Sequence, residues 1–466
     1  MLPPLPHKNW DYQSAAHLLN RAGFGGSPEE IEALQKLGHE AAVESLFDFT
    51  DDIELFPVPD FSAPDNPFTL AVEPWLGVKP ERETRLRTQQ IKYGTQAERL
   101  RTWWIDRMVR TRNPLLEKMT LFWHGHFATG IQKVNDAFLM WQQNELFRQH
   151  ALGNFATLTK AVSRDPAMMI YLDINRSNNN HPNENFAREV MELFTLGIGN
   201  YTEEDIRQAA RAFTGYRIAR ADKCSFEFYA RDHDDGPKTF LGEEANFNGD
   251  GIIDKILAQD ACAKFIARKL WRFFASENPA DTLVAQLAET LRRSNYEVRP
   301  LLREIFSSAE FYSKNTVLSQ VKSPVQYVVQ TSRQLEVHPQ PGQAQNALRQ
   351  MGQVLFAPPN VKGWDGGKAW ISTQTLLARY NLSDIFLHAG KPGERLDFSK
   401  IAPYDLRKDP DRLVARLALR LFRWPPDQHL LKSCTDFLSA QKMPFDEATI
   451  RGLLHVMMST PQFQLC

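Results

Sequence analysis

Apolar residues return at the helical period over most of this chain, and this periodicity limits the folds that it can adopt. From Arg82 onward, a spacing of about 3.6 residues predicts helices over 101–110, 115–127, 138–150, 155–162 and 185–196. Strand-like alternation occurs at 225–229 and 238–241, on either side of a turn-rich segment. We therefore predict an all-α, multi-helical fold with a small inserted β-hairpin near 225–241.

Two short patterns near the C-terminal half indicate an internal repeat. Residues 301–311 are matched in pattern by 453–463, and upstream 270–273 is matched by 421–424 at nearly the same spacing. A duplicated helical unit explains this, and chance similarity between amphipathic helices is the alternative. We predict a main helical domain over 1–390, followed by a C-terminal helical unit over 391–466 that partly repeats about 262–311.

Charge and apolar runs bear on partners and location. The formal net charge is −1, from 55 basic and 56 acidic residues, so nothing global attracts nucleic acid. No run of about 18 apolar residues occurs, so no membrane span is expected. The four cysteines are widely spaced and the first residues lack a signal-type region. As written, the chain is expected in the cytoplasm, whereas a signal removed before residue 1 would mean export.

Several longer strings are too particular for composition to explain. They are Leu-Asn-Arg-Ala-Gly-Phe-Gly at 19–25, the segments 117–127 and 165–173, Asn-Glu-Asn-Phe-Ala-Arg-Glu-Val-Met-Glu-Leu-Phe-Thr-Leu-Gly at 183–197, and the segments 233–242 and 358–370. Together they resemble the bacterial family catalogued as domain of unknown function 1800, over roughly residues 14–390. The resemblance implies no established activity. Members of that family often look secreted, and this chain departs from them in lacking a visible export signal. Their genes tend to neighbour a family similar to alkaline phosphatases and sulfatases, which implies a partner of that kind.

The helix predicted over 183–196 carries two polar rows. Glu184, Arg188 and Glu192 follow one another four residues apart, and Asn185 and Glu189 form a second row beside them. An unusual run of amide side chains over 178–183, whose last residue is Asn183, precedes the helix. We hypothesise that Arg188, Glu189 and Glu192 are catalytic and that Asn183 and Asn185 bind substrate. A solvated helix face with exposed ion pairs is the alternative.

The turn over 232–239 concentrates groups for acid–base or metal chemistry. Asp232, His233, Asp234 and Asp235 come directly before Gly236, and Lys238 follows. In our hypothesis His233, Asp234 and Lys238 are catalytic and Asp232 is a metal ligand. The alternative is a turn that uses Asp and Gly for their backbone preferences.

Two further segments resemble metal sites. His124 and His126 are candidate ligands, but residues two apart on a helix point roughly 200° apart, and His126 also fits a buried core position. The segment 246–254 matches much of a calcium loop, with Leu257 where the bidentate Glu should stand. A divalent metal is thus the implied cofactor, and a polar loop capping the helix from Ile252 is the alternative.

The loop over 358–370 holds two tryptophans and several glycines. Trp364 and Trp370 could form a platform for a sugar ring, or they could anchor the packing of the loop. The leading hypothesis from these motifs is a metal-dependent hydrolase or transferase acting on an anionic substrate, phosphorylated, sulfated or glycan-type. Its rival is a non-catalytic helical scaffold or binding module.

The leading hypothesis requires a particular arrangement. The polar rows of 183–196 should be at least half-buried beneath the 232–239 turn, because unpaired buried carboxylates are costly. Lys238, Arg188 and His124 are the cations expected opposite Glu184, Glu189, Glu192 and Asp234.

Overall fold

A computed structural model describes residues 1–49, 56–61, 82–338, 340–388, 395–422 and 427–466. The first half of the helices comprises η1 (His7–Asn9), α1 (Tyr12–Ala22), α2 (Pro28–Leu37), α3 (His39–Ser45), α5 (Arg82–Arg110), α6 (Pro114–His126), α7 (Ile131–Val134), α8 (Ala137–Gln149), α9 (Phe155–Ser163), α10 (Pro166–Tyr171), η3 (Ile174–Arg176), α11 (Glu184–Glu189), the π-helix η4 (Val190–Thr195) and α12 (Glu203–Ala212).

The second half comprises η5 (Ala230–Asp232), α13 (Gly249–Leu257), α14 (Asp260–Phe274), α15 (Asp281–Arg293), α16 (Val298–Ser307), η6 (Ala309–Tyr312), α17 (Pro324–Leu335), α18 (Pro341–Gln350), η7 (Gly367–Trp370), α19 (Thr373–His388), α20 (Phe398–Ile401), η8 (Leu406–Lys408), α21 (Pro410–Leu421), α22 (Gln428–Ser439), α23 (Glu447–Met458) and η9 (Gln462–Gln464). The predicted all-α class is confirmed. Most predicted helix bounds lie within one or two residues of these.

The inserted β-structure is confirmed as two small antiparallel sheets, although the strands pair differently from the single expected hairpin. β2 (Phe226–Phe228) pairs with β1 (Tyr216–Ile218), and β3 (Lys238–Phe240) pairs with β4 (Glu243–Ala245). The segments 225–229 and 238–241 therefore do not pair with each other. β3 instead turns back at once through Leu241 and Gly242, both at positive φ, which suits a two-residue hairpin turn.

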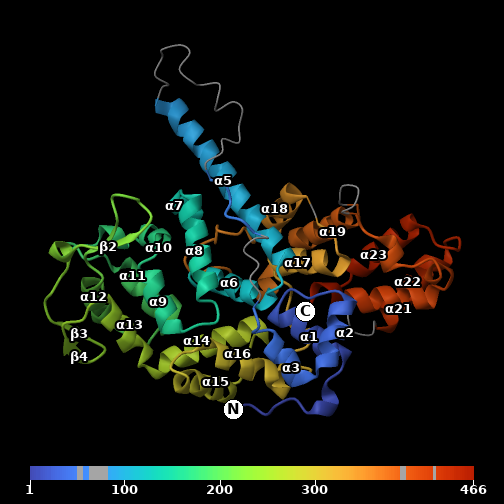
Figure 1. The fold of residues 1–466 in the computed structure, drawn as a ribbon, viewed down its shortest axis with the longest axis horizontal. Coiled ribbons are helices and arrows are strands. Elements are labelled where there is room, and N and C mark those ends of the chain that lie inside the picture. The colour runs from blue at the N-terminus through green and yellow to red at the C-terminus, as the bar shows by residue number, and fades with distance from the viewer. Residues whose placement is uncertain (50–55, 62–81, 339, 389–394, 423–426) are drawn as a thin grey trace.

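Two apolar cores fill the molecule, and α6 contributes to both. The first core joins α1–α3, α9–α16 and the inner face of α6, including Met119 and Trp123. The second joins α5, α17–α19 and α21–α23, with Leu121 of α6. Figure 1 shows α6 in the centre, the strands and α9–α13 at one end, α21–α23 at the other, and α5 projecting from the body. This position of α6 places its polar residues deep inside the molecule.

Two stretches share the same order of elements. Helices α14–α16 are followed by η6, and α21–α23 are followed by η9, with Phe311 and Phe463 buried at matching places. The first trio lies in the first core and the second trio in the second core. The duplication and the division at 390 remain predictions, and residues 389–394 and 423–426 lie outside the described part.

Candidate functional site

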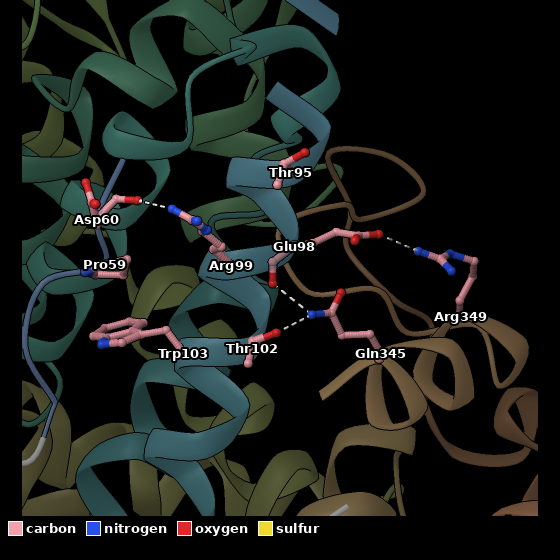
Figure 2. A pocket seen from close by; sticks show the side chains of 10 residues that line it. Pro59, Asp60, Thr95, Glu98, Arg99, Thr102, Trp103, Gln345 and Arg349 are labelled. Carbon is pink, nitrogen blue, oxygen red and sulfur yellow. Dashed lines mark hydrogen bonds and ion pairs between the residues drawn. The ribbon is translucent and has the colours of Figure 1, made fainter. Parts of the chain in front are cut away.

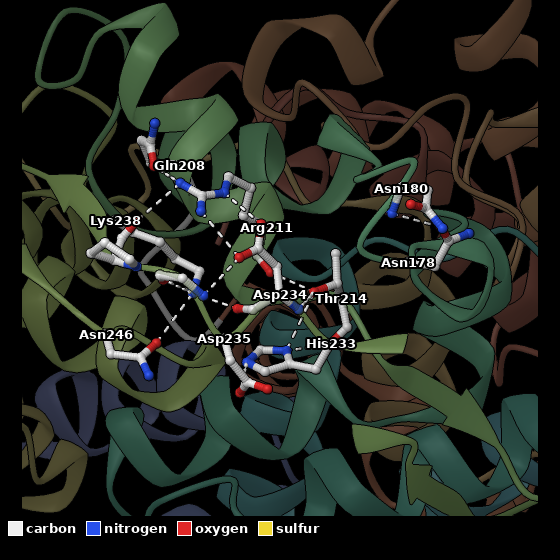
Figure 3. Close-up of polar contacts among 12 residues, drawn as sticks. Asn178, Asn180, Gln208, Arg211, Thr214, His233, Asp234, Asp235, Lys238 and Asn246 are labelled. Carbon is white, nitrogen blue, oxygen red and sulfur yellow. Dashed lines mark hydrogen bonds and ion pairs between the residues drawn. The ribbon is translucent and has the colours of Figure 1, made fainter. Parts of the chain in front are cut away.

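The turn after η5 is attached to α12 by a paired carboxylate (Figure 3). Arg211 donates from Nε to Asp234 Oδ2 at 2.7 Å and from Nη2 to Oδ1 at 3.1 Å. The backbone N–H of Gly236 adds a third bond at 2.9 Å. The hydrogen bond from Arg211 holds the pKa of Asp234 below its ordinary value. The cation paired with the Asp234 carboxylate is thus Arg211, which was not among the expected cations. Lys238 is close as well, since it donates to the Asp234 carbonyl oxygen and its charge also lowers the pKa of Asp234.

Lys238 lies under the same turn and is 1% exposed. Its ammonium donates to the carbonyl oxygens of Asp234 at 2.6 Å and Gly236 at 2.9 Å, and reaches Asn246 Oδ1 at 3.5 Å. An ammonium has three protons, so these acceptors match its full donor capacity. Burial lowers the pKa of Lys238. The side chain closes the turn from within.

His233 is buried against the end of α12. Its Nδ1 lies 2.8 Å from the carbonyl oxygen of Thr214, so Nδ1 carries the proton, and Nε2 is 3.9 Å from the exposed Asp235. Gly215 leaves the room for this contact: its φ is +81°, and a Cβ there would lie 3.1 Å from the Cβ of His233. Asp232, proposed as a metal ligand, accepts from Arg217 at 2.7 Å.

The polar rows of α11 and η4 face the beginning of α12. Arg188 donates to both carboxylate oxygens of Glu203, at 2.9 and 2.8 Å, and to Glu184 at 3.4 Å. Glu192 accepts from the hydroxyl of Tyr201 at 2.9 Å. Glu189 is half-buried, and burial together with the nearby Glu192 raises its pKa against the opposing effect of Arg188.

The two groups of predicted catalytic residues meet different turns of α12. Arg188 pairs with Glu203 in the first turn, whereas Asp234 pairs with Arg211 eight residues later, roughly 12 Å along the axis. The amide run connects them structurally, since the Asn179 backbone donates to Asp232 O at 2.9 Å. Asn183, a predicted substrate ligand, caps α11 by accepting from the Asn185 N–H at 2.9 Å. The Asn185 amide itself reaches Asp173 at 3.4 Å.

His124 and His126 bond to separate parts of the core. His124 Nε2 accepts from the Phe356 N–H at 3.0 Å, and burial lowers the pKa of His124 to about 3. His126 Nε2 lies 3.0 Å from Phe194 O, and its Nδ1 lies 3.1 Å from Lys269 Nζ. The buried core position considered for His126 is the one observed. In the described ranges, no three His, Cys, Asp or Glu residues are grouped so as to hold a metal ion.

The calcium-like segment has its acidic groups paired with α9. Asn248 caps α13 by accepting from Gly251 N at 2.9 Å. Asp250 pairs with Arg164 and Asp254 with Lys160, each at 2.6 Å. The capping alternative therefore describes what Asn248 does here.

The loop over 358–370 packs against α6. Trp370 is 8% exposed, so it anchors the loop, while the half-buried Trp364 lies 5.8 Å from the ring of His124. Gly363, at φ +82°, touches the carbonyl of Gly125 so closely that a Cβ would collide with it. This contact fixes the loop to the end of α6.

A groove that the motifs did not indicate runs along α5 (Figure 2). Its volume is about 670 Å³, and its walls are Pro59 and Asp60 on one side and Gln345 and Arg349 of α18 on the other. The α5 side chains that line it share one helix face: Thr95, Glu98, Arg99, Thr102 and Trp103. Their spacing of three and four residues is the sequence signal that could have revealed this face.

Hydrogen bonds fix the walls of this groove in place. Gln345 donates to Glu98 O at 2.7 Å and to Thr102 Oγ1, and Arg99 donates to Asp60 O at 3.0 Å. Arg349 lies 3.6 Å from the Glu98 carboxylate.

Trp103 is the aromatic wall and is held from several directions. Its Nε1 donates to Pro57 O at 3.0 Å. The guanidinium groups of Arg107 and Arg148 lie 5.7 and 5.4 Å from its ring centroid. The indole is nevertheless only half-buried, so a preorganised ring borders the groove.

Comparison with known proteins then places the chain. A family model described as protein of unknown function (DUF1800) matches residues 17–465. The chain belongs to the DUF1800 family. The match continues through the C-terminal unit, beyond residue 390. No curated protein matches the chain, and no solved structure matches it. Within the part of this DUF1800 chain that the structure describes, no helix is long and apolar enough to cross a membrane.

The sequence segments that resemble the DUF1800 family provide helix caps and close contacts between elements. Asp165 and Asn183 cap helices, Gly363 allows the loop to reach α6, and Gly23 lies against Pro114. Lys238 closes its turn from inside. These roles explain why the particular residues are needed without assigning them chemistry.

Proposed function

We propose that this DUF1800 protein is a helical binding module that takes a glycan-type ligand in the α5–α18 groove. One observation carries the proposal: Trp103 is fixed and half-exposed beside amide, hydroxyl and charged side chains of both signs. A sugar presents an apolar C–H face, which stacks on an indole, and hydroxyl groups, which both donate and accept. Asp60, Glu98 and the amide oxygen of Gln345 accept, while Arg349 donates.

Size and charge agree with such a ligand. A volume of about 670 Å³ falls within the range of about 300–1,000 Å³ typical of small-molecule sites. Two carboxylates, Asp60 and Glu98, balance two guanidinium groups, Arg99 and Arg349. A groove without net charge favours a neutral polyhydroxylated ligand over a strongly anionic one.

The bonding of the 232–239 turn also supports the binding module over the catalytic hypothesis for those residues. Asp234 is engaged by Arg211, and Lys238 by two carbonyl oxygens. Removing either side chain would expose unsatisfied groups, so a structural role accounts for both.

The test is ligand binding by the whole chain. A glycan array provides the first ligand, and titration calorimetry measures Trp103→Ala and Arg349→Gln against the unmodified protein. We expect Trp103→Ala to weaken binding at least about tenfold, because stacking is lost. Arg349→Gln keeps the fold intact, since its side chain is 54% exposed, and weakens binding less.

Arg268→Gln is the matched control, because Arg268 is a similarly exposed arginine paired with a carboxylate, Asp281. It should bind like the unmodified chain. Binding that survives both groove variants would exclude this groove, and a chain that binds no glycan would exclude the ligand class.

A second candidate function, a metal-dependent hydrolase or transferase for an anionic substrate, is favoured by Glu189. That carboxylate is half-buried, has a raised pKa, and lies one helical turn from Glu192 and beside Arg188. Glu189→Gln should abolish turnover of aryl phosphates, sulfates or glycosides assayed with divalent metals, without altering the fold. Absence of turnover by the unmodified chain alone and with a co-purified phosphatase-like partner would exclude it.

A further inference from the structure

A second concavity lies far from the α5 groove, where the end of α14 meets the beginning of α15. Its volume is about 640 Å³, and it is formed by Leu2 and Pro3, by residues between Trp271 and Gln286, by Glu310 and by the turn that follows η6. Its lining belongs wholly to described residues, and among these none is Lys, Arg or His. The charge of the site therefore comes from its two carboxylates.

Those carboxylates belong to Glu277 and Glu310, and neither forms an ion pair with a basic side chain in the described ranges. Glu310 accepts a bond from Ser313 Oγ at 3.3 Å. Glu277 packs against Gly367, at φ +55°, where any Cβ would collide with the carboxylate. The Glu277 carboxylate therefore lies directly against the backbone of the loop that carries Trp370. Two carboxylates that form no ion pair in the described ranges, in a lining without basic residues, give the concavity a negative potential.

The remaining walls indicate what kind of cation fits. Leu283, together with Leu2 and Pro3 near the N-terminus, offers apolar surface suited to methylene groups. Asn278, Gln286 and the hydroxyl groups nearby provide oxygen acceptors for the three protons of an ammonium group.

We propose that this pocket binds a primary alkylammonium group, with Glu277 as its main counter-charge and Glu310 as the outer one. The group has an aliphatic body that lies along the apolar wall and a charged head that reaches the carboxylates. It is supplied either by a free diamine or by the lysine side chain of a peptide. This site is separate from the groove on α5, so it stands whether or not that groove binds glycans.

The experiment uses the full chain and four probes: 1,5-diaminopentane, an N-acetylated lysine amide, the neutral 1,5-pentanediol and Mg²⁺ alone. Titration calorimetry should show binding of the diamine that weakens as salt is raised, and none of the diol. Binding of the lysine amide as well would identify peptide lysine as a source. Binding of the diamine alone would identify free diamines.

Variants locate the site. Glu277→Gln should weaken diamine binding by about tenfold or more, since it removes a charged acceptor, and Glu310→Gln should weaken it less because Glu310 is exposed. Glu289→Gln, on the outer face of α15 and paired with Arg292, is the control and should leave affinity unchanged. Thermal melts should coincide for all three, as Glu277 has no ion pair to lose.

Several results would overturn the proposal. They are diol binding as tight as diamine binding, undiminished diamine binding by Glu277→Gln, or no diamine binding by the unmodified chain. Tight Mg²⁺ binding that Glu277→Gln abolishes and that excludes the diamine would assign the pocket to a metal instead.

Discussion

Glu117 on α6 and Asp165 before α10 are both buried carboxylates, at 0% and 2% exposure, yet their surroundings differ completely. Glu117 accepts from Arg107 at 2.7 Å, from Arg148 at 2.6 and 2.9 Å and from Trp104 Nε1 at 2.9 Å. Asp165 accepts from the Met168 N–H at 2.8 Å and the Gln143 amide at 2.7 Å. The described residues provide no partner for its Oδ1.

The two pKa values move in opposite directions for this reason. Burial alone would raise the pKa of Glu117, but the two arginines outweigh it and lower the value. Burial raises the pKa of Asp165 to about 7, because its neutral donors compensate only in part. Although both carboxyl groups are buried, Glu117 is therefore charged at pH 7, whereas Asp165 is partly protonated.

The difference also reaches the surface. The arginines that bind Glu117 are the ones that lie beside the indole of Trp103, so the buried charge supports the wall of the α5 groove. Asp165 instead caps its own helix and accepts from Gln143 of α8. The paired charges around Glu117 therefore help to position a side chain at the surface, Trp103.

The largest expected effect comes from removing the paired carboxylate. Glu117→Gln removes the buried counter-charge that Arg107 and Arg148 share, and we expect a loss of about 3 to 5 kcal/mol in the free energy of unfolding. Urea unfolding followed by circular dichroism measures it. Glu145→Gln is the control, since Glu145 contacts Arg148 at the partly exposed rim and should cost less than about 1 kcal/mol. Equal losses would show that burial of the charge is unimportant.

Asp165 should make stability depend on pH in the opposite sense to a paired carboxylate. Between about pH 4 and 7 the folded chain retains a proton that the unfolded chain has released, so stability falls as pH rises through this window. Asp165→Asn removes a contribution of a few kcal/mol to that fall. The measurement is the difference between variant and unmodified chain in guanidinium unfolding at pH 4, 5.5 and 8. A difference that is constant with pH would mean that Asp165 is ionised throughout.

Lys238 is an intermediate case, a buried cation bonded to neutral oxygens. Lys238→Met leaves the carbonyl groups of Asp234 and Gly236 without their donor, and we expect a loss of about 1 to 3 kcal/mol. Lys255→Met, which removes an ion pair with the exposed Glu243, should cost less than about 1 kcal/mol. If Lys238→Met leaves stability intact while a ligand or reaction is lost, the turn has a direct functional role.

Local features of the fold could be predicted, because the residues that decide them are neighbours in sequence. Ser27 with Glu30 and Thr202 with Asp205 form reciprocal capping boxes. Strand pairing could not be predicted in the same way. The segment 216–218 is too short to show the alternation of a strand. The contact between the rings of Tyr216 and Phe226, whose centroids are 5.0 Å apart, arises only in the folded chain.

In the candidate site, too, contacts between residues distant in sequence could not be predicted. Spacing placed Glu184 opposite Arg188 correctly, since both lie on one helix. It did not reveal that Arg211, 23 residues away, would bind Asp234, or that α18 would complete the groove on α5. Types of residue can be read from a sequence, whereas the partner that determines their charge state comes from tertiary packing.

The smallest expected effect comes from removing a single hydrogen-bond donor to a carboxylate that is only partly buried. Tyr201 donates to Glu192 at 2.9 Å, just as Trp104 donates to Glu117, but Glu192 is only half-buried. In Tyr201→Phe, water can replace the lost donor, so we expect a loss below about 1 kcal/mol in urea unfolding. Trp104→Phe removes its donor where no water can enter and also leaves a void, so it should cost several times more. Similar losses from both variants would show that water is excluded from Glu192 as fully as from Glu117, and the carboxylate of η4 would then belong to the core.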